Sequence, residues 1–144
     1  MNWKNEATEK LRRYEAMCTA IVNMEEELKR LELESKGIRS AQADGIKVRG
    51  SQGRKDPILN NLIRKQELRD SLRQTKLWVD CTQRALEVLA EEERLLLRRM
   101  YIYPERGCLE RLCGELGVEQ SSIYRRRDAA LQRFTEALYG YRAT

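Results

Sequence analysis

Histidine is absent from the 144-residue sequence, and proline is scarce at two residues. Without histidine, mixed cysteine–histidine zinc sites are excluded. The cysteines form no CxxC pair, and their scatter does not suit a four-cysteine zinc site either. We interpret them as reduced thiols that serve as small apolar groups, and the sequence predicts neither a metal nor another cofactor. The four cysteines are Cys18, Cys81, Cys108 and Cys113.

Long apolar runs are also missing. No stretch approaches the roughly 18 residues needed to span a bilayer. The first six residues, MNWKNE, lack the apolar segment of a signal peptide. The sequence therefore predicts a cytoplasmic protein without a membrane partner.

Features of an enzyme are lacking as well. No glycine-rich phosphate-binding loop precedes a helix, and no pair of carboxylates points to a catalytic pocket. The two acidic runs, at 25–27 and 91–93, are typical of solvated helix faces. We therefore expect no enzymatic activity.

Charged residues, by contrast, are abundant at 35%, while aromatic residues make up only 6%. This composition favours amphipathic helices, whose exposed faces need charge, over a sandwich or an α/β core. The sequence therefore predicts an all-α fold. The net charge of +5 permits a polyanionic partner such as nucleic acid without requiring one.

The first segment, about 5–36, contains neither glycine nor proline. Its apolar residues recur in steps of three and four, which predicts a long helix with one apolar stripe. A solitary helix cannot bury such a stripe, so it must pair with a helix of the same chain or of a second copy. The stripe consists of Leu11, Tyr14, Cys18, Ile21, Met24, Leu28 and Leu31.

Glycines at four positions of the segment 37–56 predict a loop. Over 36–56, six basic and two acidic residues give a net charge of +4, most of the excess of the whole chain. The loop is either a solvated connector or a basic arm whose Lys47 and Arg49 contact DNA phosphates.

Asp56 and Pro57 are a good start for a second long helix, with the aspartate as N-cap and the proline in the first turn. We expect this helix to reach about Leu89 and to form an antiparallel hairpin with the first, giving a domain over 1–85. Its apolar stripe is predicted at Ile58, Leu62, Leu68, Leu72, Val79 and Leu86.

The remaining domain, 86–144, differs from the first in its residue pattern, which predicts shorter helices. A helix rich in leucine is expected to end near Pro104 and Gly107, followed by a short helix over 108–116 and a longer one to about Leu138. Gly117 between them supplies the left-handed geometry of a tight turn. The pattern matches a DNA-binding helix-turn-helix through Leu112, Cys113, Leu116, Gly117, Val118 and Ile123.

Packing of Val118 and Ile123 against the short helix leaves a polar face on the start of the longer helix, where a reading helix enters the major groove. Arginine can bind guanine with two hydrogen bonds, and glutamine can pair with adenine. The arginine triplet 125–127 is either a solvated face or a DNA contact, and its position behind the turn favours DNA. Arg126 departs from the pattern, because an aliphatic residue is usual there. The predicted outward residues are Gln120, Ser121, Tyr124, Arg125 and Arg127.

The strings ALEVLAEEERLLLRRMYI and ERLCGELGVEQSSIYRRRDAAL resemble region 4 of sigma-70-type factors, which reads the −35 promoter element. The whole chain looks like the small ArpU- and RinA-type late-gene regulators of phages and prophages. The resemblance covers about the last 60 residues; the hairpin and loop match only in layout. It implies that Gln120, Ser121 and Arg125 read bases, flanked by Ser122, Tyr124 and Arg127 as backbone contacts.

This resemblance also implies a phage or prophage transcriptional regulator that acts on double-stranded DNA at promoters with host RNA polymerase. Because no sigma region 2 is recognisable, we expect a promoter-binding regulator, not a complete sigma factor. The helices at 11–86 are expected to form either a stalk or a homodimer interface that positions two reading helices. Two alternatives are the small terminase subunit of a phage, a DNA-packaging adaptor that assembles into rings, and a structural coiled-coil protein.

Overall fold

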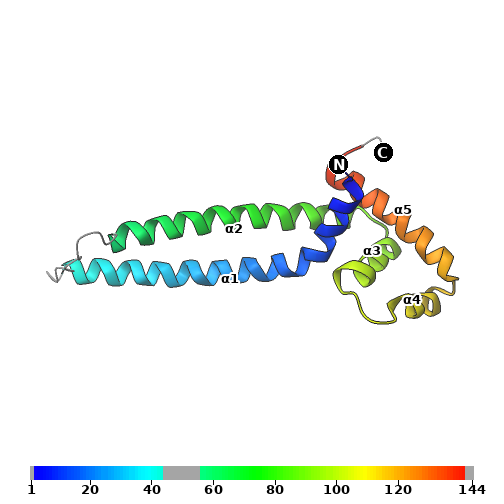
Figure 1. Ribbon diagram of the computed structural model, residues 1–144, viewed down its shortest axis with the longest axis horizontal. Helices are drawn as coiled ribbons and strands as arrows, with labels where there is room; N and C mark the ends of the chain where they lie inside the picture. The colour runs from blue at the N-terminus through cyan, green and yellow to red at the C-terminus, as the bar shows by residue number, and fades with distance from the viewer. Residues whose placement is uncertain (1, 44–55, 142–144) are drawn as a thin grey trace. The chain divides into compact units, whose positions relative to one another are not determined.

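The computed structural model describes residues 2–43 and 56–141, and every regular element in these residues is helical (Figure 1), which confirms the all-α class. The described residues form two compact units. The hairpin unit is Thr19–Leu77, and the composite unit combines Met1–Cys18 with Trp78–Thr144. The elements are α1 (Trp3–Ala43), α2 (Pro57–Glu87), α3 (Glu91–Leu97), the π-helix η1 (Arg98–Ile102), α4 (Cys108–Leu116) and α5 (Gln120–Tyr139).

The two long helices begin at side-chain caps. Asp56 Oδ1 accepts a hydrogen bond from the backbone N–H of Ile58 at 2.9 Å, and Pro57 occupies the first helical position. Asn2 Oδ1 accepts in the same way from the N–H of Asn5 at 3.2 Å. These oxygens satisfy backbone donors that a helix start leaves without a partner. The predicted start of the second helix is confirmed.

The predicted end of the first helix is wrong. α1 continues through Gly37 to Ala43, so the part of the expected loop at 37–43 is helical, and its part at 44–55 lies outside the described residues. Its buried face extends beyond Leu31 to the buried Ser35 and the half-buried Ile38. A single exposed glycine costs a helix only about 1 kcal/mol. A cost of that size is small enough for α1 to continue past Gly37.

In the hairpin unit, α1 and α2 run antiparallel, as predicted (Figure 1). The α1 stripe predicted from the sequence is half-buried or buried at every position within this unit. On α2, the side chains that face α1 recur in steps of three and four, a seven-residue repeat of the coiled-coil kind. These positions are Ile58, Asn61, Lys65, Leu68, Leu72 and Thr75.

One stripe residue predicted on α2 is therefore wrong. Leu62 is 48% exposed and lies with Leu59 and Ile63 on the outer face of the helix. The neighbouring positions Asn61 and Lys65 are buried in its place. Burial of these two polar side chains is tolerated because α1 supplies polar partners for both.

A polar network joins the two helices at these positions. Lys65 Nζ donates to Ser35 Oγ at 2.8 Å and lies 3.6 Å from a carboxylate oxygen of Glu32. Ser35 Oγ in turn donates to Asn61 Oδ1, and Asn61 Nδ2 donates to the carbonyl of Leu31 at 3.1 Å. Directional bonds of this kind hold only in one alignment, so they fix the register of the hairpin.

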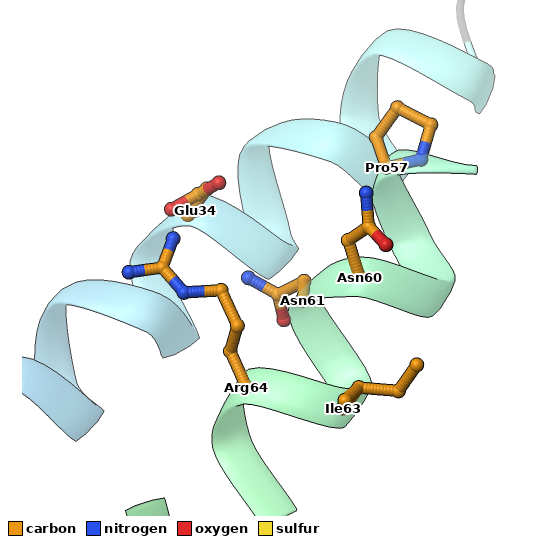
Figure 2. A pocket seen from close by; sticks show the side chains of 6 residues that line it. All are labelled: Glu34, Pro57, Asn60, Asn61, Ile63 and Arg64. Carbon is orange, nitrogen blue, oxygen red and sulfur yellow. The ribbon is translucent and has the colours of Figure 1, made fainter. Parts of the chain in front are cut away.

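Figure 2 shows the adjoining part of the hairpin, where Asn60, Asn61 and Arg64 of α2 lie with Glu34 of α1 around a groove. Arg64 Nη2 also lies 3.5 Å from Glu27 Oε1. Ion pairs this exposed add about 0–1 kcal/mol each. They favour the antiparallel pairing without dominating its stability.

The composite unit has its own apolar core, built from segments far apart in the sequence. Ala7 and Leu11 at the start of α1 pack in one cluster with residues of the end of α2, of α3 and of α5. Phe134 of α5 belongs to this cluster and is fully buried. The unit boundaries thus cut through both long helices, at 18/19 and 77/78, whereas the sequence prediction placed one domain boundary at 85/86.

Among the described helices, none combines the length and the apolar character needed to span a bilayer.

Candidate nucleic-acid interface

Two glycines frame α4, and both adopt left-handed backbone geometry. Gly107 precedes the helix with φ of 76°, and Gly117 ends it with φ of 65° and ψ of 35°. After Gly117, the N–H of Val118 donates back to the carbonyl of Cys113 at 3.2 Å. The geometry predicted for Gly117 is confirmed, and it lets the chain turn within three residues to start α5 at Gln120.

A second apolar cluster holds α4 against α5. Its buried members are Leu96 of α3, Leu112 of α4 and Ile123 of α5. Ile123 is 0% exposed, so this residue fixes which side of α5 faces inward. The predicted packing of Val118 and Ile123 is confirmed. Partly buried residues complete the cluster: Leu95, Met100, Leu109, Cys113, Leu116 and Val118.

The polar residues at the start of α5 lie mostly outward. Gln120, Ser121 and Arg125 are exposed, and Tyr124 is 41% exposed. Ser122 is half-buried beside them. The structure thus brings four of the predicted site residues onto the solvent side of one helix end.

The three consecutive arginines have different surroundings. Arg125 is exposed and forms no ion pair within residues 2–43 and 56–141. Arg126 forms an ion pair with Glu92 of α3. Arg127 lies 2.9 Å from Asp128 Oδ1, and its guanidinium lies 4.9 Å from the centre of the Tyr124 ring. The triplet therefore presents less uncompensated charge than its composition indicates.

The sequence reasoning missed two acidic residues that shape this surface. Asp128 is exposed and follows Ser121 by seven and Arg125 by three positions, so the three share one helix face. That helical spacing could have revealed Asp128. Glu92 carries no such local signal, because it lies 34 residues before Arg126 in the chain.

Beneath this surface, Tyr101 of η1 is half-buried against the apolar core of the composite unit. Burial raises the pKa of its phenol above the usual value, although the nearby Arg127 and Arg12 act in the opposite direction. The Arg12 guanidinium lies 5.7 Å from the centre of the ring. The phenol therefore stays neutral at physiological pH and carries no charge into the site.

Two predicted contacts, Lys47 and Arg49, lie outside the described residues. All four cysteines are free. In the part of the chain that the structure describes, no three acidic or cysteine side chains gather in a way that could hold a metal ion.

In comparisons with known proteins, no family model, curated protein or solved structure matches this chain.

Proposed function

We propose that α4 and α5 form a helix-turn-helix that binds double-stranded DNA, with the start of α5 in the major groove. The observation that carries this proposal is the orientation of α5. Ile123 is fully buried against Leu112, while Ser121 and Arg125 lie on the solvent side. A groove is read by an exposed polar face on a helix that its neighbours hold rigidly.

The chemistry of this face suits duplex DNA. The guanidinium of Arg125, which forms no ion pair within the described residues, can donate two hydrogen bonds to the O6 and N7 atoms of guanine, and the Gln120 amide can pair with adenine. Ser121 can reach bases or phosphates. Ser122, Tyr124 and Arg127 flank these residues as backbone contacts. The Arg127 guanidinium lies over the Tyr124 ring and beside Asp128, two contacts that favour its present position on the helix.

The biological role in this proposal is a phage or prophage transcriptional regulator that acts at promoters with host RNA polymerase. Its support is the resemblance of the last 60 residues to sigma region 4. The protein acts by binding and not by catalysis.

The proposed active form is a homodimer, because paired modules read two half-sites about one helical turn apart. Outward-facing Leu59, Leu62 and Ile63 on α2 offer apolar surface for such an assembly. Lys47 and Arg49 remain proposed phosphate contacts.

The test is the affinity of the Arg125→Ala variant for a duplex that the wild-type protein selects from a random-sequence pool. Loss of a bidentate base contact should weaken binding by about 1–3 kcal/mol and relax the preference at one base pair. Arg13→Ala removes the same charge from an exposed position on α1 and serves as the control. Equal affinities of the wild-type, Arg125→Ala and Arg13→Ala proteins contradict the base-reading assignment.

The same preparation separates the alternatives. A ring-sized particle in light scattering, together with selection of a packaging sequence, favours a small terminase subunit. Failure to bind any duplex at low salt favours a structural coiled-coil protein.

A further inference from the structure

The acidic first turn of α3 lies against α5 through two ion pairs. Glu92 binds Arg126, and Glu93 binds Arg133. Glu93 also accepts a hydrogen bond from the backbone N–H of Ala90 at 3.0 Å, and its side chain is only 17% exposed. Glu93 is thus built into the start of α3, whereas the Glu92 side chain is 44% exposed.

Arg126 occupies an edge of the proposed reading helix. Successive residues of a helix are rotated by about 100°, so Arg126 lies between the outward position of Arg125 and the buried positions of Ile123 and Ala130. Side chains at such an edge meet the sugar–phosphate backbone when a helix enters the major groove. The guanidinium of Arg126 is directed to Glu92 instead.

We propose that Glu92 withholds Arg126 from the DNA backbone, an inference that rests on the proposed function. The carboxylate occupies the place that a phosphate oxygen would take at the guanidinium. If Arg126 turned to DNA, Glu92 would be left without its partner beside a row of phosphates. Glu92 therefore limits how tightly the protein binds DNA of any sequence, while Arg125 stays available for bases.

The acidic run provides a matched set of variants for the test. Glu92→Gln removes the charge that holds Arg126. Glu91→Gln removes the same charge from an exposed neighbour that forms no ion pair within the described residues. Arg126→Met removes the guanidinium but keeps an apolar stem over the core, and circular dichroism checks that each variant is folded.

The readout is the affinity for one random-sequence duplex at several salt concentrations. A new phosphate contact steepens the slope of log K against log salt by about 0.9 and tightens binding roughly tenfold at low salt. Glu92→Gln should show this change, and Glu91→Gln and Arg126→Met should keep the wild-type slope. The Glu92→Gln/Arg126→Met double variant should return to that slope.

Equal slopes for Glu92→Gln and Glu91→Gln overturn the inference while leaving DNA binding intact. So does a loss of about 0.9 in the slope with Arg126→Met alone, because Arg126 then already contacts phosphate in the wild type. Absence of duplex binding by the wild-type protein overturns the proposed function itself and the inference with it.

Discussion

Each arginine of the triplet 125–127 has a role set by its neighbours. Arg125 is exposed and forms no ion pair in the described residues, Arg126 is paired with Glu92, and Arg127 contacts Asp128 and the Tyr124 ring. Composition cannot separate these three identical side chains, because the partner that distinguishes Arg126 comes from another helix. The positive charge that this proposed site offers to DNA therefore depends on which arginines are paired with carboxylates, as well as on how many arginines are present.

Glycine at the turn is open to a direct test. Gly117→Ala should lower the free energy of unfolding by about 1–2 kcal/mol, because an L-residue is strained at a φ of 65°. Gly114→Ala should raise it by about 0.5–1 kcal/mol, because this glycine lies inside α4. An added Cβ meets no atom within 4 Å at either position, so backbone geometry alone separates them. Urea unfolding measures both, and destabilisation of equal size in the two variants contradicts the account.

Helix pairing in the hairpin unit depends on polar residues as well as apolar ones. The face of α2 that packs against α1 carries Asn61 and Lys65 at positions where a simple coiled coil has leucine or isoleucine. Their partners Ser35, Glu32 and the Leu31 carbonyl all belong to α1. This arrangement buries less apolar surface than an all-apolar interface, but it specifies one register of α1 against α2.

Asn61 is the residue that should reveal this dependence. Asn61→Ala should cost about 1–3 kcal/mol, because Ser35 Oγ–H loses its acceptor and the Leu31 carbonyl loses its side-chain donor in a buried place. Asn60→Ala, on the adjacent half-buried position, should change stability by less than about 0.5 kcal/mol. Thermal unfolding followed by circular dichroism compares the two. An equal loss of stability in the Asn60→Ala and Asn61→Ala variants contradicts the stabilising role of the network.

Sequence periodicity predicted where the helices lie better than which of their residues face a neighbouring helix. The α1 stripe and the burial of Ile123 were readable, because apolar side chains repeat at helical spacing. Leu62 was assigned to the wrong face of α2, since apolar character alone favours it over Lys65. The correct assignment, with Lys65 buried and Leu62 exposed, requires knowledge of the polar partners that α1 offers to Lys65.

For the whole molecule, the start of α1 belongs to the same compact unit as α5, although more than a hundred residues separate Leu11 from Phe134. No pattern in the sequence indicated this contact, because periodicity reports a face and not its partner. The outward face of α5 could be predicted, since Ile123 and Gly117 specify it locally. Which arginines on it remain free could not, because Glu92 is distant in sequence.

The proposed function requires that the outward face at the start of α5 reads DNA sequence. Selection of duplexes from a random-sequence pool by the 144-residue protein tests this requirement. We expect one recurring motif, repeated at half-sites about one helical turn apart, since a dimer would present two α5 helices to one side of the duplex. An unenriched pool, with binding that only weakens as salt rises, would contradict the claim and leave nonspecific attraction between charges.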